Sequence, residues 1–254
     1  MTKNIEFRNA AVYIILRFLI VLTIVLSVLR HDYDSVFTCC IALLLFTIPS
    51  IVDKKFNVEL PTTLESIIYL FIFSSQILGE IRNFYGMFPY WDTMLHTING
   101  FIFAGIGFSI CEVLNNSPKT KLFLSPLYIT VVAILFSITI GTVWEFFEYG
   151  VDRYMYADMQ KDRVITDLYT VYFNDTNTVE SFNDITQTVI YYGDGEVLVV
   201  DGFLDMGLND TMKDMIVNFI GAIVFAFFGY FYEKGNIKCE FVKNFIPRKK
   251  VKDE

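Results

Sequence analysis

Six apolar segments alternate with polar stretches along the chain. They cover about residues 10–29, 35–51, 64–81, 93–113, 126–148 and 211–232. A helix needs about 20 mostly apolar residues to cross a bilayer. The pattern therefore predicts an all-α polytopic membrane protein with about six transmembrane helices. The first segment is expected to be a retained helix, because Arg17 interrupts it and no small-x-small cleavage pattern follows it.

One polar segment, residues 153–208, is long enough to form a module outside the membrane. It contains "TQTVIYYGDGEVLVVDG", in which two runs rich in Val, Ile and Tyr flank a Gly-Asp-Gly turn. This pattern is typical of a β-hairpin. We therefore divide the chain into a five-helix membrane part (1–152), an acidic extracytoplasmic loop or cap (153–208), and a sixth helix with a basic cytoplasmic tail (209–254). An ordinary solvated surface would also account for the acidic composition of the insertion.

Composition agrees with a protein largely covered by lipid. The mean hydropathy is +0.47, and 17 % of the 254 residues are aromatic while only 19 % are charged. An ordinary soluble domain of this length seldom has such values. The net charge of −8 comes mostly from the insertion, so no nucleic-acid partner is expected. The expected surroundings are the lipid bilayer of the cell membrane.

Basic residues predict the orientation, because cytoplasmic loops are enriched in Lys and Arg. With both termini in the cytoplasm, the inner segments hold 13 Lys and Arg and the outer segments hold six. The sequence therefore predicts cytoplasmic termini and an extracytoplasmic insertion. That insertion contains no cysteine, so no external disulfide is expected.

Ionisable side chains gather at one predicted depth, near the outer ends of several helices. Their spacings are helical: three or four residues separate neighbours within each helix, so each set shares one face. Asn218 continues the last set one turn deeper, and Glu80 and Asp152 lie near the same level. The expected site residues are Asp92 and His96, then Glu145 and Glu148, then Asp210 and Asp214.

Charge neutralisation explains how such a group persists in a membrane. A charged side chain at the bilayer centre costs roughly 2.5–3.5 kcal/mol, and neighbouring carboxylates also repel one another. Protons, a metal ion or a cationic ligand would relieve both costs. All six residues are therefore candidate metal ligands, and all except Asp210 are candidate catalytic residues. One His with five carboxylates favours Mg²⁺, Mn²⁺ or Ca²⁺ over Zn²⁺.

Each residue taken alone has a simpler explanation. Asp210 can cap a helix N-terminus with Asp214 in the first turn. Glu148 can be interfacial, and His96 can be an ordinary core histidine. The functional interpretation depends on several helices that bring ionisable side chains to the same depth in the membrane.

Three blocks carry a resemblance to a known family. "YWDTMLHTINGF", "WEFFEYGVD" and "GLNDTMKDMIVNFIGA" resemble the signature blocks of the YjdF-like, DUF2238-type bacterial inner-membrane proteins. More distantly, their order resembles the VanZ-like family. The resemblance covers roughly residues 64–232 and implies the same fold and the same six site residues. This chain has "MGLND" where the family has a Gln-Gly-Asp-type turn. The resemblance leaves the reaction open.

Three kinds of function are compatible with these residues. The first is a metal-dependent hydrolase or transferase that acts on a lipid-linked or envelope small-molecule substrate near the outer leaflet. The second is a proton- or cation-linked transporter, although no matching acidic set occurs at the inner ends of the helices and no inverted repeat is evident. The third is a non-catalytic binding, resistance or structural protein. No Gly-rich phosphate loop or nucleophile-elbow motif occurs in the sequence.

Overall fold

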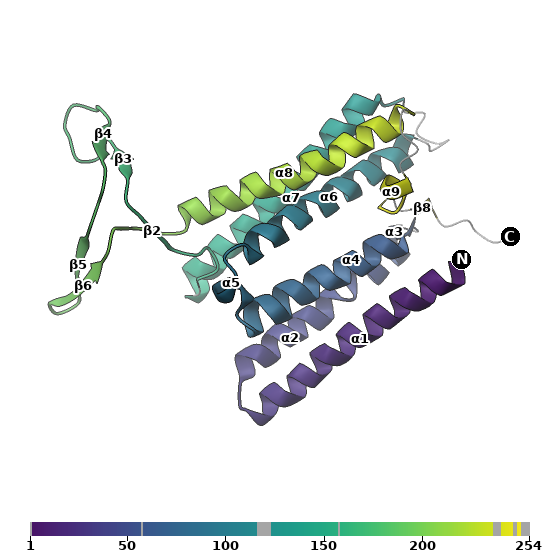
Figure 1. Cartoon of the computed structure of the whole chain (residues 1–254), viewed down its shortest axis with the longest axis horizontal. Helices are drawn as coiled ribbons and strands as arrows, with labels where there is room; N and C mark the ends of the chain where they lie inside the picture. The colour runs from purple at the N-terminus through teal and green to yellow at the C-terminus, as the bar shows by residue number, and fades with distance from the viewer. Residues whose placement is uncertain are drawn as a thin grey trace. The chain divides into compact units, whose positions relative to one another are not determined.

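The computed structural model describes residues 2–56, 58–115, 123–156, 158–235, 240–245 and 248–249. Helices dominate it, and six helical stretches are long and apolar enough to cross a membrane, which confirms the predicted fold class (Figure 1). The helices are α1 (Thr2–Leu29), α2 (Tyr33–Leu45), α3 (Ile48–Phe56), α4 (Thr62–Phe73), the π-helix η1 (Ser74–Ile81), α5 (Phe84–Met87), α6 (Trp91–Asn115), α7 (Pro126–Met155), α8 (Leu208–Glu233) and α9 (Glu240–Lys243).

The chain forms two compact units. The first comprises residues 1–141 and 215–254, and the second comprises residues 142–214. Both boundaries fall inside a continuous helix, within α7 and within α8. The first unit is therefore a membrane bundle, and the second contains the insertion with the adjoining turns of two helices.

Two helical stretches are longer than the sequence pattern predicts. The second span covers Tyr33–Lys55, because only a short turn separates α2 from α3. Helix α7 extends to Met155, so Asp152 lies inside the helix and not beyond its end. The Asp152 carboxylate binds the segment that follows the helix: it accepts hydrogen bonds from the backbone N–H groups of Met159 and Gln160 at 2.5 and 2.8 Å. The polar residues at this end of the apolar segment therefore form the last turns of α7 and do not end the helix.

The described part of the bundle has two apolar clusters. One joins α1, α2 and α4, which lie side by side in Figure 1, and it is centred on Ile20, Ala42, Phe46 and Tyr69. The other joins α6, α7 and α8 around residues such as Phe108, Ile129 and Phe225. Many remaining apolar side chains point outward, among them Ile14, Phe18, Val25, Leu135 and Phe227. Lipid is the surrounding that suits such a surface.

Small residues let α6 and α8 approach closely. A Cβ atom on Gly100 would lie 1.9 Å from the backbone oxygen of Asn218, and one on Gly221 would lie 2.0 Å from the backbone oxygen of Thr97. Only glycine fits at such a contact between membrane helices. These two contacts fix how α8 lies against α6, and therefore which face of α8 is turned toward it.

The described residues of the second unit form three strand pairs. They are β2 (Arg163–Ile165) with β7 (Phe203–Asp205), β3 (Leu168–Thr170) with β4 (Glu180–Phe182), and β5 (Thr188–Tyr192) with β6 (Glu196–Val200), all antiparallel. The last pair confirms the predicted hairpin, and Gly193 and Gly195 supply the positive φ angles of its turn. In the bundle, β1 (Val58–Glu59) pairs with β8 (Arg248–Lys249).

Candidate functional site

The first turns of α6 bring a carboxylate and an imidazole together. Asp92 and His96 are one turn apart on the same face, and Asp92 Oδ1 lies 3.5 Å from His96 Nε2. His96 is only 8 % exposed. The Asp92 carboxylate therefore helps to orient the His96 ring and places a negative charge beside it.

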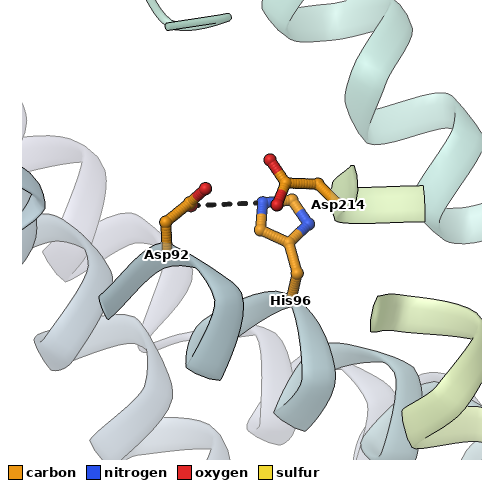
Figure 2. A group of neighbouring side chains, drawn as sticks. All are labelled: Asp92, His96 and Asp214. Carbon is orange, nitrogen blue, oxygen red and sulfur yellow. Dashed lines mark ion pairs between the residues drawn. The ribbon is translucent and has the colours of Figure 1, made fainter. Parts of the chain in front are cut away.

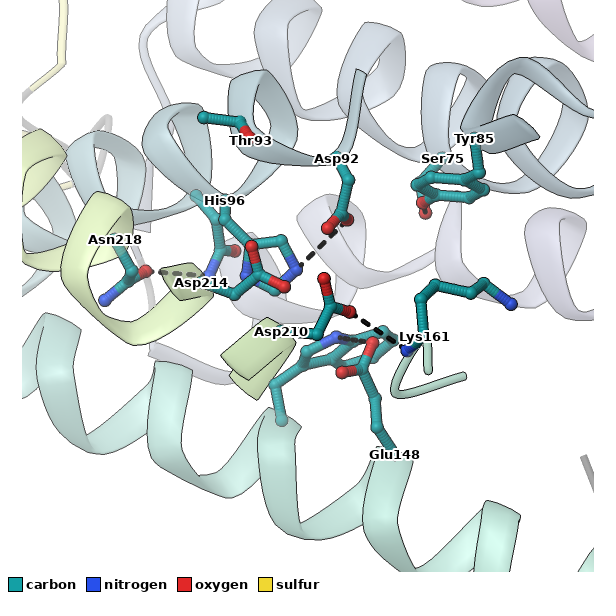
Figure 3. Close-up of polar contacts among 12 residues, drawn as sticks. Ser75, Tyr85, Asp92, Thr93, His96, Glu148, Lys161, Asp210, Asp214 and Asn218 are labelled. Carbon is teal, nitrogen blue, oxygen red and sulfur yellow. Dashed lines mark hydrogen bonds and ion pairs between the residues drawn. The ribbon is translucent and has the colours of Figure 1, made fainter. Parts of the chain in front are cut away.

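A polar layer one turn deeper holds the helices in register. Asn99 of α6 donates to Asn218 Oδ1 at 3.2 Å, and Asn218 donates to the backbone oxygen of Ser137 in α7 at 3.4 Å. The Ser137 hydroxyl in turn donates to the Gly100 oxygen at 2.8 Å. Three helices of the bundle thus share one hydrogen-bonded layer, part of which appears in Figure 3.

Asp214 lies one helical turn before Asn218 and shares its face. Its carboxylate joins the pair on α6: one potential ligand atom from each of Asp92, His96 and Asp214 lies within 4.8 Å of the other two (Figure 2). Asp214 is only 2 % exposed. One imidazole nitrogen and two carboxylate oxygens at this spacing are a donor set able to hold a divalent cation.

Lys213 adds a positive charge beside this group. Its ammonium nitrogen lies 3.8 Å from Asp214 Oδ1, although adjacent side chains on a helix normally diverge. The ammonium offsets part of the negative charge on Asp214. The sequence interpretation did not include Lys213 in the site, because its position in the chain gives no sign of this contact.

Asp210 has a different set of partners. The Arg163 guanidinium donates to Asp210 Oδ1 through Nη2 at 2.6 Å and Nε at 3.3 Å, and the backbone N–H of Lys161 donates to Oδ2 at 3.0 Å. Both carboxylate oxygens are thus engaged by residues of the insertion, and Figure 3 shows the contact with Lys161. Helical spacing could not predict Arg163, which is 47 residues away in the chain.

The two glutamates of α7 are buried, with Glu145 4 % exposed and Glu148 9 % exposed. Glu148 Oε1 accepts a hydrogen bond of 2.8 Å from the indole nitrogen of Trp144. Within the described part of the chain, the close three-residue group contains neither glutamate and does not contain Asp210. The proposed ligand roles of these three residues therefore stay predictions.

Comparison with known families places the chain in a family. A family profile described as "Predicted membrane protein (DUF2238)" matches residues 11–235. The chain belongs to the DUF2238 family. No curated protein and no solved structure matches it. The more distant resemblance to VanZ-like proteins stays a prediction.

The DUF2238 match covers the bundle and the insertion together. It begins in α1 and ends just after α8, so all six expected site residues lie inside it. The insertion is thus part of the matched region. Membership shows a multi-pass membrane protein and assigns no activity to it.

Proposed function

We propose that this DUF2238 protein is a metal-dependent hydrolase or transferase that acts on a lipid-linked or envelope substrate. The observation that carries the proposal is the approach of Asp92, His96 and Asp214 to within 4.8 Å of one another. These residues would hold a divalent cation. Carboxylate-rich donor sets suit Mg²⁺ or Mn²⁺ better than Zn²⁺.

The chemistry of such an ion supports hydrolysis or group transfer. A bound divalent cation polarises a phosphoryl or carbonyl oxygen and lowers the pKa of coordinated water. Glu145 and Glu148, buried near the end of α7, are the candidate general bases under this proposal. Because the metal-binding residues lie in the first turns of apolar helices, a substrate carried by a lipid is the kind expected to reach them.

Chelation and one matched pair of variants test the metal. Purified protein is melted with and without a strong chelator, and its metal content is measured. Chelation should lower the midpoint of the wild type, since a ligand at 100 times its dissociation constant stabilises by about 2.7 kcal/mol. Asp214→Asn should lose both the metal and the response to chelator. Asp210→Asn should lower the midpoint because the charged contact between Asp210 and Arg163 is lost, while metal content stays at the wild-type level.

Two further results would overturn parts of the proposal. An unchanged wild-type midpoint under chelation, with no metal in the sample, would remove the metal site and leave proton-linked or structural roles for the acids. In that case Glu145→Gln, which mimics a protonated carboxyl, should be tolerated. A metal that binds without any hydrolysis of lipid phosphates or esters by wild type would remove the enzymatic part alone.

A further inference from the structure

Arg17 lies within a candidate membrane span and is exposed. The span covers Ala10–Leu29, and its apolar neighbours Ile14 and Phe18 are 62 % and 63 % exposed. At a rise of 1.5 Å per residue, Arg17 is about 10 Å along the helix from the start of the span. Charged residues inside membranes almost always face the bundle interior. Arg17 instead faces the surface that lipid covers, so a group from outside the bundle can reach its charge.

The side chain of Arg17 is directed toward the beginning of α1. Its guanidinium donates to the hydroxyl of Tyr13, one turn earlier, and lies 5.6 Å from the centre of the Tyr13 ring. The Tyr13 ring packs against Tyr69 at 5.0 Å and Phe46 at 6.1 Å between centroids. Tyr13 is therefore held by the bundle and in turn holds the guanidinium.

This direction brings the charge close to the membrane surface. Reaching back over one turn of about 5.4 Å leaves the guanidinium roughly 5 Å inside the start of the span. Long basic side chains near the end of a membrane helix extend in this way toward the interface. Among the described residues, no carboxylate forms an ion pair with Arg17. A guanidinium has five N–H donors, and one is used on Tyr13.

We propose that Arg17 and Tyr13 form a binding site for the phosphate of an anionic lipid, in the leaflet at which α1 begins. Guanidinium and phosphate match in a bidentate geometry, and the exposed side chains of Ile14 and Phe18 suit the acyl chains. A second copy of this chain is a poorer occupant. Residues 10–31 contain no Asp or Glu, so parallel α1 helices would bring Arg17 against Arg17.

Lipid retention provides the test. Wild type and variants are extracted from bilayers that contain phosphatidylcholine with phosphatidylglycerol, and bound lipid is measured by native mass spectrometry. Wild type should retain phosphatidylglycerol. Arg17→Gln should reduce the retained amount about tenfold, the effect expected for losing hydrogen bonds to a charged group. Arg17→Leu, which suits the apolar surroundings, should do the same. Arg30→Gln, which removes a charge just past the other end of α1, should retain the wild-type amount.

Other outcomes would contradict the site. Equal retention by wild type, Arg17→Gln and Arg17→Leu would overturn it. A change of oligomeric state in the Arg17 variants without lipid loss would point to a protein partner instead. Release of phosphatidylglycerol from wild type by millimolar inorganic phosphate would assign the site to a free anion. Retention that persists in phosphate but not in the Arg17 variants supports the lipid.

Discussion

At the scale of single residues, the buried acids differ in what offsets their charge. Asp210 is held by the Arg163 guanidinium at 2.6 Å, and Glu148 accepts the indole N–H of Trp144. Asp214 has an ammonium at 3.8 Å and lies in one group with Asp92 and His96. Burying a charge is costly unless it is paired. A divalent cation is the partner that would offset both carboxylates of that group together.

Asp32, between the first two spans, allows a prediction with a defined pH dependence. Its side chain caps α2 by accepting from the backbone N–H of Ser35 at 3.1 Å. Hydrogen bonds from Ser35, from the side chain first and then the backbone, hold the pKa of Asp32 below its ordinary value of 3.8. The stabilisation is therefore full above that value and is lost as the pH falls through the lowered pKa.

Substitution of Asp32 tests this directly. Asp32→Ala should lower the melting midpoint at neutral pH, because the cap is lost, whereas Asp32→Asn should nearly keep it, because Asn also caps helices. Any excess stability of wild type over Asp32→Asn should vanish in acid. A midpoint that Asp32→Ala leaves unchanged at neutral pH would show that the cap contributes nothing.

At the scale of helices, close packing of α6 and α8 positions the site. Gly221→Ala places a Cβ atom 2.0 Å from the Thr97 oxygen, so the two helices must move apart. Overpacking of this kind costs typically about 1–3 kcal/mol. The expected result is a lower melting midpoint together with weaker metal binding, since Asp214 lies on α8 and His96 on α6.

Gly150 supplies the matched control. It lies inside α7, and no atom lies within 4 Å of a Cβ built on it. Gly150→Ala should therefore stabilise by roughly 0.5–1 kcal/mol, because alanine loses less backbone entropy in a helix. Equal effects of the two substitutions on the midpoint would contradict the close contact at Gly221.

Helices and their internal faces could be predicted from the sequence, because apolar length and a four-residue repeat are local signals. Asp92 with His96, and Asp214 with Asn218, follow from that repeat. The π-helical geometry of Ser74–Ile81 has no such signal, since the apolar pattern of the segment is equally compatible with an α-helix. The sequence pattern ends the fifth span at about residue 148 because polar residues follow, whereas α7 continues to Met155.

Contacts between distant parts of the chain were beyond sequence reasoning. The pairing of Asp210 with Arg163 joins α8 to a strand of the insertion, and strand β2 pairs with β7 across some 40 residues. Such contacts depend on the fold of the insertion, which one sequence does not reveal. The spacing predicts which residues share a helix face. It does not distinguish Asp210, which pairs with Arg163, from Asp214, which lies in one group with His96.

At the scale of the whole molecule, six apolar helices and DUF2238 membership show a multi-pass membrane protein. The Lys and Arg distribution predicts cytoplasmic termini, and this orientation stays a prediction. If it holds, the first turns of α6 and α8 lie near the outer leaflet. A substrate would then reach the metal group from the extracytoplasmic side, whereas the Arg17 site would lie at the opposite leaflet.

The central claim is that Asp92, His96 and Asp214 hold a divalent cation. Anomalous diffraction from a crystal soaked in Mn²⁺ tests it most directly, because the signal locates the ion independently of the protein's own scattering. The account predicts one strong peak between the three side chains, with ligand distances of about 2 Å as for other small hard cations, and no such peak in Asp214→Asn. A peak absent from these residues at saturating Mn²⁺, or found instead at Asp210, would contradict the claim.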